Sequence, residues 1–471
     1  MDGLECSEIK LSSLERTARI DAEFYQKRNL AVEQILKRWY KQSFTDCFYV
    51  SDGNHMSISE EFCSDGVSYY RGQDIYHLFI EAASPLKITQ RAFNAPQMKR
   101  SHLRKGDVLM SIVGAIIGNS AIVTTDTKAT CSCKLSILRA KSNCILPEVL
   151  LVYIKTKYGQ NQIQKFKRGA AQTGLLLEDF EQLFIPQFGS ELQHTICNLI
   201  GLIRQNLDHS ILLYEEAHGL LLSHLGIDSY APNPSGIAVK SFTNSFGTSG
   251  RLDSEYYQPK YEEMLQAIST HNPKKLGGVN GIVEIKKSIE PGSDYYGDEG
   301  VPFVRVSNLS KYEISKPDIK IPFDTVGNIH ELYPKRDTIL LSKDGSVGIA
   351  FKVEEDMQCV TSGAILHLTV KNTAEILPDF LTLVLNSKAV QMQAERDAGG
   401  SIIQHWKQSE IEEAFIPVLE MDKQLEISIK IEEFFALRKK SAELLELAKT
   451  AVEVAIEQGE DNAIAMLEGV V

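Results

Sequence analysis

Two short groups of residues in this 471-residue chain have the composition of known catalytic or metal sites. Glu284-Ile285-Lys286 has the Glu-x-Lys pattern of metal-dependent nucleases, but no acidic residue lies between Glu263 and Glu284 to serve as the upstream metal ligand. Cys131-x-Cys133, followed by Cys144, lacks the second Cys or His pair that a structural zinc site requires. We therefore interpret the first group as an exposed charge pair and the second as part of a strand, and we predict no metal and no cofactor.

Other enzyme classes are excluded by the motifs that they would need. The chain has no GxxxxGK[ST] phosphate loop, no GxGxxG after a strand and no [DNS]PP[YF] tetrapeptide of an amino-methyltransferase. Its eleven histidines are scattered, and no Ser/His/Asp set surrounds a nucleophile elbow. These observations predict a binding protein without catalytic residues, and they leave an enzyme with an unrecognised site as an alternative.

Positive charge is concentrated in one part of an otherwise acidic chain. The formal net charge is −12, yet residues 84–170 hold fifteen Lys or Arg against three acids, while residues 420–471 hold twelve acids against six bases. A basic segment of this kind is typical of a surface that contacts phosphates. A fluctuation of solvated surface charge is the alternative explanation.

The elements that position these residues occur twice. ARIDAEFYQKRN at 18–29 returns as GRLDSEYYQPKY at 250–261, and the LFIP that ends at Pro186 returns as the AFIP that ends at Pro417. The offsets are 232 and 231 positions, far longer than the roughly 20–50 residues of a solenoid repeat. The chain is therefore a domain-sized duplication, which suggests two similar modules with different targets.

Each half is predicted to be a helix, a strand-rich globule and a long helix. The first helices are expected at 21–40 and 253–268, and the globules at about 44–188 and 274–418. Runs such as VSYY, DVLMSIVG and AILHLTV, broken by Gly, Asn and Pro, indicate short strands, and 147–157 and 378–387 read as helices. The predicted fold class is α+β.

The two long helices carry a duplicated heptad pattern. Apolar residues spaced by seven predict a helix-pair seam at Ile200, Leu207, Tyr214, Leu221, Ile431, Leu445 and Val452. We expect the two helices to pack against each other as an antiparallel, coiled-coil-like pair. The alternative is that each helix only covers its own globule.

Three features together resemble the specificity subunits of type I restriction–modification systems. The first is the duplicated order of globule and long helix. The second is KGDVLMSIVGAIIGNSAIV at 105–123 with its copy KRDTILLSKDGSVGIAFKV at 335–353. The third is the element that closes each globule, RGAAQTGLLLEDFEQLFIP at 168–186 and GGSIIQHWKQSEIEEAFIP at 399–417. The first closing element departs from the family pattern, because it has a run of three leucines and lacks the His-Trp-Lys of the second.

The resemblance implies a role and partners. Each globule would be a target recognition domain that reads one half of a split, asymmetric double-stranded DNA sequence, and the helices would act as a ruler for the gap. The chain would do no chemistry itself but would assemble with two adenine-N6 methyltransferase subunits, with or without ATP-dependent restriction subunits. The alternative from another class is a duplicated protein-interaction scaffold that does not bind DNA.

The resemblance also implies which side chains would reach DNA, because phosphates favour Lys and Arg, and base edges favour Arg, Lys, Gln, Asn and Ser. In the first globule we expect Arg71, Gln73, Lys99, Arg100, Lys134, Lys165, Lys167 and Arg168. In the second we expect Arg305, Ser307, Asn308, Lys343, Gln404, His405 and Lys407. Trp406 could be a core residue or a DNA contact.

The predicted boundaries follow the duplication. They are a first recognition domain at 1–188, a long helix at 189–228, a linker at 229–250, a second recognition domain at 251–419, a long helix at 420–459 and a tail at 460–471. The N-terminus lacks a basic segment followed by an apolar run, and no apolar stretch is long enough to cross a bilayer. With eight irregularly spaced cysteines, this predicts a cytoplasmic protein with free thiols.

Overall fold

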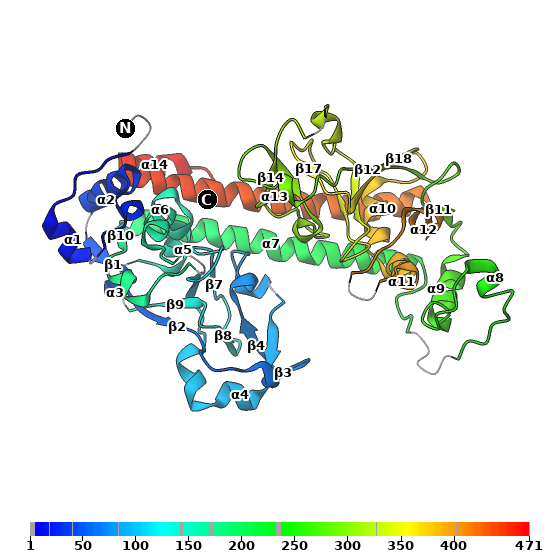
Figure 1. The fold of residues 1–471 in the computed structure, drawn as a ribbon, viewed down its shortest axis with the longest axis horizontal. Helices are drawn as coiled ribbons and strands as arrows, with labels where there is room; N and C mark the ends of the chain where they lie inside the picture. The colour runs from blue at the N-terminus through cyan, green and yellow to red at the C-terminus, as the bar shows by residue number, and fades with distance from the viewer. Residues whose placement is uncertain are drawn as a thin grey trace. The chain divides into compact units, whose positions relative to one another are not determined.

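The computed structural model of the chain describes residues 5–17, 19–39, 41–82, 84–141, 145–169, 173–231, 237–325, 327–400 and 403–470. It divides into two compact units, unit 1 (Met1–Gln205 with Lys440–Val471) and unit 2 (Asn206–Lys439). Both units mix helices and short strands, which confirms the predicted α+β class. Figure 1 labels the elements.

Unit 1 begins with helices whose predicted continuity is broken. Its first elements are α1 (Leu11–Thr17), a 3-10 turn η1 (Ala22–Tyr25) and α2 (Lys27–Trp39). The helix expected at 21–40 is interrupted because Gln26 has an extended backbone, with φ −55° and ψ 144°. Tyr40 lies outside the described residues. The buried side-chain amide of Asn29, in α2, donates across this break to the carbonyl of Glu23 at 3.0 Å.

The globule of unit 1 contains two four-stranded sheets. The antiparallel sheet has the order β2-β9-β6-β7, and the second sheet has the order β3-β5-β4-β8, in which β4 and β8 are parallel. The strands are β1 (Lys41–Ser43), β2 (Phe48–Asp52), β3 (Phe62–Cys63), β4 (Val67–Tyr70), β5 (Leu86–Ile88), β6 (Val108–Ser111), β7 (Ser120–Ile122), β8 (Ala129–Cys131), β9 (Leu135–Ala140) and β10 (Phe184–Pro186). The helices between them are α3 (Phe44–Cys47), α4 (Gln90–Asn94), α5 (Pro147–Lys155) and α6 (Lys157–Phe166). The expected helix 147–157 ends early because Thr156 caps α6, its hydroxyl accepting from the amide of Gly159.

Unit 2 repeats this plan in the same order. Its antiparallel sheet is β12-β18-β15-β16, and its second sheet is β14-β13-β17, in which β13 and β17 are parallel. The strands are β11 (Lys274–Lys275), β12 (Val283–Lys287), β13 (Val301–Val304), β14 (Lys320–Ile321), β15 (Ile339–Ser342), β16 (Ala350–Lys352), β17 (Val360–Thr361), β18 (Ile365–Val370) and β19 (Phe415–Ile416). The helices are α8 (Phe246–Ser249), α9 (Pro259–Ile268), α10 (Pro378–Leu385), α11 (Lys388–Asp397) and α12 (Gln408–Glu413). The helix expected at 253–268 begins only at Pro259. Proline is favoured at the first position of a helix, so Pro259 marks its start. The predicted linker 229–250 contains α8, and its residues 232–236 lie outside the described residues.

The long helices are α7 (Ser190–His224) and α13 (Met421–Gln458), and α14 (Glu460–Leu467) follows. Within unit 2 the two helices run antiparallel, because Tyr214 meets Phe434 at a ring distance of 5.3 Å while Glu216 pairs with Lys430 and His224 with Glu426. Of the seam residues, Ile200, Tyr214, Leu221, Ile431 and Val452 are buried, and Leu207 and Leu445 are half-buried.

Neither long helix is confined to its own globule. The part of α7 in unit 2 shares one apolar core with the second globule, through Ala217 and Leu221. In unit 1 the end of α13 contacts the first globule, where the indole of Trp39 donates to the carbonyl of Ile456 at 2.7 Å. The hydroxyl of Tyr158 also donates to Glu457 at 2.8 Å. In Figure 1 α2 accordingly lies beside the end of α13 and α14.

Candidate nucleic-acid interface

In unit 1, two loops are joined by backbone hydrogen bonds. We name residues 112–119, between β6 and β7, the hairpin loop of unit 1, and residues 167–176, described at 167–169 and 173–176, its closing loop. The amide of Gly114 donates to the carbonyl of Thr173 and that of Leu175 to Ile112, both at 2.9 Å. Two backbone hydrogen bonds between Arg168 and Gly174 also join the two sides of the closing loop.

Unit 2 has the same two loops. Its hairpin loop is 343–349, between β15 and β16, and its closing loop is 398–407, described at 398–400 and 403–407. The amide of Gly345 donates to the carbonyl of Gln404 at 2.9 Å, and that of Trp406 donates to Lys343 at 2.8 Å. A pair of bonds between Gly399 and His405 narrows the loop. Each unit thus presents a composite site, defined here as its hairpin loop together with its closing loop.

Tight turns in the hairpin loops need glycine. Gly114 and Gly118 have φ of 91° and 92°, and Gly345 and Gly348 have φ of 75° and 82°. This is the left-handed region that glycine adopts without strain. These glycines therefore act as turn formers in both hairpin loops.

The composite site of unit 2 carries a charged side-chain cluster. One carboxylate oxygen of Asp344 lies 2.8 Å from Nδ1 of His405, and the other pairs with the ammonium of Lys343. The imidazole is more than half exposed, whereas the side chains of Lys343 and Asp344 are mostly covered. Asp344 therefore holds two of the predicted site residues together and leaves Nε2 of His405 free of the carboxylate. Asp344 is not among the residues predicted from the sequence, although it lies within the duplicated motif at 335–353.

The rest of that closing loop separates core from surface. Gln404 and Lys407 are exposed, and the ammonium of Lys407 lies 3.5 Å from Glu410. Trp406 is fully buried, so it is a core residue of unit 2. Its indole N–H has no hydrogen-bond partner among the described residues.

The composite site of unit 1 carries a different pair. Arg168 forms an ion pair with Asp179, whose side chain is almost fully buried and accepts from the amide of Leu176 at 2.7 Å. Burial raises the pKa of Asp179, in opposition to that backbone hydrogen bond and to the nearby Arg168. Lys167 is half-buried beside this pair. Asp179 occupies the place of Glu410, 231 residues earlier, and this offset is the signal that could have revealed both carboxylates.

A second pair of equivalent positions follows the strands β4 and β13. Arg71 and Arg305 each cap a 3-10 turn, and their amides donate to Asp74 at 2.7 Å and to Asn308 at 3.0 Å. The next residue but one, Gln73 or Ser307, is exposed in each unit. The guanidinium of Arg305 also pairs with Asp318 at 2.9 Å, and the amide of Asn308 donates to Ser315. Gln73 and Ser307 are therefore placed alike, on the surface of their own unit.

The remaining predicted cations of unit 1 are not brought together. Lys99 and Lys134 are exposed, and Arg100 is tied to Asp52 at 2.9 Å. Lys165 is mostly buried, pairs with Glu33 at 2.7 Å and lies over the ring of Phe24. Although burial acts to raise it, the pKa of Glu33 is lowered by hydrogen bonds from Lys165 and Lys37. The ion pair and the ring contact of Lys165 are therefore both made within the fold of unit 1.

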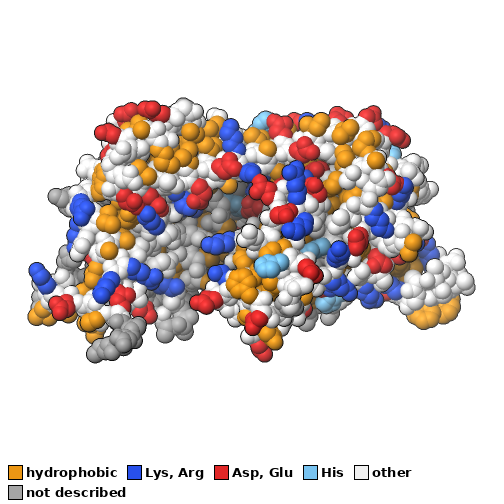
Figure 2. Space-filling model, turned by 90° about the horizontal axis from the view of Figure 1, so that it is seen from above, with side chains coloured by type: hydrophobic (Ala, Val, Ile, Leu, Met, Phe, Trp, Pro, Cys, Tyr) orange, Lys and Arg blue, Asp and Glu red, His pale blue; other side chains and the backbone are white. Residues whose placement is uncertain are grey.

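Charges of both signs are interspersed on the face seen in Figure 2, which shows Lys and Arg next to Asp and Glu over much of its surface. Lys286 and Glu284 form an exposed pair, 3.7 Å apart, as predicted for the Glu-x-Lys fragment. Within the described residues no group of three or more His, Cys, Asp or Glu could hold a metal ion. Cys131 is a buried strand residue, and Cys144 lies outside the described residues.

Two further findings concern the chain as a whole. Seven cysteines are described, and all of them are free thiols. Among the parts of the chain that the structure describes, no helix is long and apolar enough to cross a membrane.

Comparison with known proteins matches part of the chain to one family. The family model described as "Type I restriction modification DNA specificity domain" matches residues 269–447. Over 100 residues the chain is 31% identical to the type I restriction enzyme EcoBI specificity subunit of Escherichia coli. That match covers 21% of this chain and 21% of the relative, about a fifth of each.

Solved structures give matches over a longer range. The S subunit of a type I restriction-modification system from M. genitalium is 14% identical, with 91% of this chain and 95% of that chain covered and a TM-score of 0.36. The HsdS subunit from Thermoanaerobacter tengcongensis is 17% identical, with 89% and 96% covered and a TM-score of 0.30. The family resemblance predicted from the sequence is confirmed by the family model and the curated relative.

Proposed function

We propose that this chain, whose residues 269–447 belong to the family of type I restriction-modification DNA specificity domains, is the non-catalytic subunit that selects the DNA target of a methyltransferase complex. It reads a split, asymmetric sequence, with one half-site for each globule. The proposed recognition domains are 1–188 and 251–419, and the long helices 189–228 and 420–459 set the gap between the half-sites. The linker 229–250 and the tail 460–471 complete the proposed division.

The observation that carries the proposal is the recurrence of one composite site with different side chains. In both units a hairpin loop and a closing loop are joined by the same backbone bonds. Unit 2 fills the join with Lys343, Asp344 and His405, and unit 1 fills it with apolar residues and Arg168. A shared frame with different polar groups is suited to reading two different short sequences.

The chemistry of the exposed residues fits DNA. Phosphate contacts fix the position of a protein on a duplex, and base edges in the major groove specify the sequence. We assign base reading to Gln73, Ser307, Gln404 and His405, which are exposed. We assign phosphate contacts to Lys99, Lys134, Lys167 and Lys407.

Catalysis is assigned to partners. We propose that two adenine-N6 methyltransferase subunits bind this chain, one for each copy of the duplicated plan, with or without restriction subunits. The family match supports this assembly, because the family model is defined for specificity domains.

The experiment is a map of N6-methyladenine across the source genome with this gene intact and deleted. We expect a split motif that disappears on deletion, and that motif would supply both half-sites and the gap. A methylome that is unchanged by deletion, together with purified complex whose DNA binding does not weaken with salt, would favour the protein-interaction scaffold instead.

A further inference from the structure

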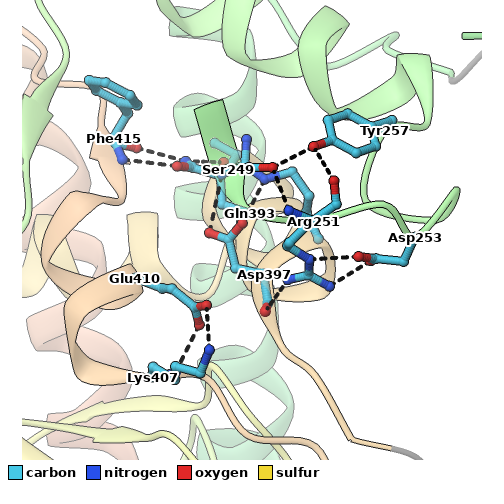
Figure 3. A network of polar contacts seen from close by, with 11 residues as sticks. Ser249, Arg251, Asp253, Tyr257, Gln393, Asp397, Lys407, Glu410 and Phe415 are labelled. Carbon is cyan, nitrogen blue, oxygen red and sulfur yellow. Dashed lines mark hydrogen bonds and ion pairs between the residues drawn. The ribbon is translucent and has the colours of Figure 1, made fainter. Parts of the chain in front are cut away.

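Arg251 binds the backbone at the start of the closing loop in unit 2 (Figure 3). The guanidinium of Arg251 donates to both oxygens of Asp253, at 2.9 and 2.7 Å. Its remaining terminal nitrogen donates to the carbonyl of Asp397 at 3.0 Å. The hydroxyl of Tyr257 donates to the carbonyl of Arg251 at 3.0 Å, which fixes the backbone of the arginine.

Unit 1 contains the same set of bonds. The guanidinium of Arg19 donates to Asp21 at 2.6 and 2.5 Å and to the carbonyl of Phe166 at 3.2 Å. The hydroxyl of Tyr25 donates to the carbonyl of Arg19 at 3.1 Å. We name each set the arginine clamp of its unit: Arg19, Asp21 and Tyr25 in unit 1, and Arg251, Asp253 and Tyr257 in unit 2.

The carbonyl that each clamp binds has a particular place. Phe166 is the last residue of α6, and Asp397 is the last residue of α11. Carbonyls in the last turn of a helix have no partner within the helix and carry its partial negative charge. A guanidinium there is favourable, and it fixes the direction in which the closing loop leaves the helix.

At the far end of each closing loop, a carboxylate accepts a hydrogen bond from the loop backbone. Glu410 accepts from the amide of Lys407 at 3.1 Å, and Asp179 accepts from the amide of Leu176. The pKa of Arg251 is raised by its hydrogen bonds to Asp253 and by the attraction of the carboxylates of Asp253 and Glu410. The pKa of Arg19 is likewise raised by its hydrogen bonds to Asp21 and by the attraction of the carboxylates of Asp21 and Asp179. Each arginine therefore bonds the start of the loop directly and attracts the carboxylate at its far end through space.

The clamps are identical in residue type, whereas the loops that they hold are not. Arg, Asp and Tyr recur in both copies, while Arg168 stands where the second copy has Gly399, and Gly174 stands where it has His405. An ion pair at a partly exposed site contributes little to stability, because solvent screens it. A requirement for loop geometry explains two identical clamps better than a need for that small stabilisation.

We propose that Arg19 and Arg251 are positioning residues, each of which sets the closing loop of its own unit for reading one half-site. This inference rests on the proposed function. It assigns to the clamps no contact with DNA; their effect is on the position of Arg168 in unit 1 and of Gln404 and His405 in unit 2.

The test uses Arg251→Gln and Arg19→Gln in the full chain, each assembled with its methyltransferase subunits. The readout is the methylated motif, with the midpoint of thermal unfolding measured alongside. Arg251→Gln is expected to lower selectivity about tenfold at positions of one half-site, and Arg19→Gln at positions of the other, while the opposite half-site stays unchanged. Arg251→Lys retains the charge but not the planar fork, so it should relax the same half-site less than Arg251→Gln does.

Two results would overturn the proposal. One is an unchanged motif in the glutamine variants, with or without a lowered midpoint, which would make the clamp a structural contact only. The other is an equal loss at both half-sites. If the wild-type chain itself specifies no split motif, the proposed function fails before any variant is compared, and the inference fails with it.

Discussion

At the join between hairpin loop and closing loop, unit 2 carries Lys343, Asp344 and His405 where unit 1 carries Ile112, Val113 and Gly174. The backbone bonds around these residues are the same in both units. The residue under the join is buried in each case, Trp406 in unit 2 and Leu175 in unit 1. The frame of the composite site is therefore set by backbone pairing and a buried anchor, which leaves the surface side chains free to differ.

A second difference is the position of the cation. In unit 1, Arg168 at the start of the closing loop pairs with Asp179, and in unit 2, Lys407 at its end pairs with Glu410. The two carboxylates are equivalent, but the cations come from opposite ends of the loop. The position of the carboxylate is therefore the same in both units, while the position of the cation that pairs with it differs.

The largest effect is expected from the buried anchors. Trp406→Ala should destabilise unit 2 by about 3–5 kcal/mol because a fully buried indole is lost, and Leu175→Ala should destabilise unit 1 by about 2–5 kcal/mol. Denaturant unfolding of the purified chain measures both. Trp406→Phe serves as the control and should cost less than Trp406→Ala, because the indole N–H makes no hydrogen bond among the described residues. Equal costs for Ala and Phe would show that Trp406 is not a packing anchor.

Next in size is the loss of the cluster that distinguishes unit 2. Asp344→Ala removes the carboxylate that orients His405 and pairs with Lys343, so selectivity at one half-site should fall about tenfold, the effect of one good base contact. Initial methylation rates on the cognate duplex and on single-base variants give this ratio. The matched change in unit 1, Val113→Ala, should alter the ratio less than twofold. A larger effect from Val113→Ala than from Asp344→Ala would reverse the comparison.

A pH effect should separate the two units at another pair of equivalent positions. Burial, with a smaller contribution from Lys449, lowers the pKa of Lys155 to about 8, and its ammonium donates to the carbonyl of Ser120. Asn386 stands in its place in unit 2 and bonds Ala350 through both amide atoms. Between pH 8 and the ordinary lysine pKa of about 10.4, the unfolded state binds more protons than the folded state, so the free energy of unfolding rises with pH.

Lys155→Asn removes this dependence. The wild type should gain on the order of 1 kcal/mol relative to the variant between pH 7.5 and pH 10, as measured by urea unfolding at the two pH values. Parallel pH profiles for the wild type and the variant would contradict the account of Lys155.

The smallest effect concerns one turn. Gly106 has φ 86°, and its equivalent Asp337 has φ 64°, so the same left-handed position holds glycine in unit 1 and aspartate in unit 2. Gly106→Asp should cost about 1 kcal/mol, while Asp337→Gly should be close to neutral. Thermal unfolding of both variants compares them. A neutral Gly106→Asp would show that the turn is not strained for a residue with a side chain.

The sequence predicts the repeated part of the fold well, because the duplication gives two readings of each element. The strands at 108–111 and 339–342 and the turns at Gly114 and Gly345 follow from local pattern. The helix breaks at Gln26 and Thr156 were missed, since a single extended residue hardly changes the apolar spacing on either side.

Long-range pairing explains the rest. That residues 440–471 join residues 1–205 depends on contacts such as Trp39 with Ile456, which no local pattern reveals. Among the candidate site residues, Lys343 and His405 are held together by Asp344, which the sequence did not reveal. Lys165 and Arg100 instead pair with Glu33 and Asp52, 132 and 48 residues away in sequence. A list of basic residues cannot show which cations are already paired within the fold.

We propose that the two composite sites read two different half-sites. The most direct measurement is the methylated motif of a chain in which unit 2 receives the residues of unit 1, Lys343→Ile, Asp344→Val and His405→Gly. We predict that one half-site changes or becomes degenerate, while the other half-site and the gap stay as in the wild type. An unchanged motif, or the loss of both half-sites from a chain that still folds and assembles, would contradict the account.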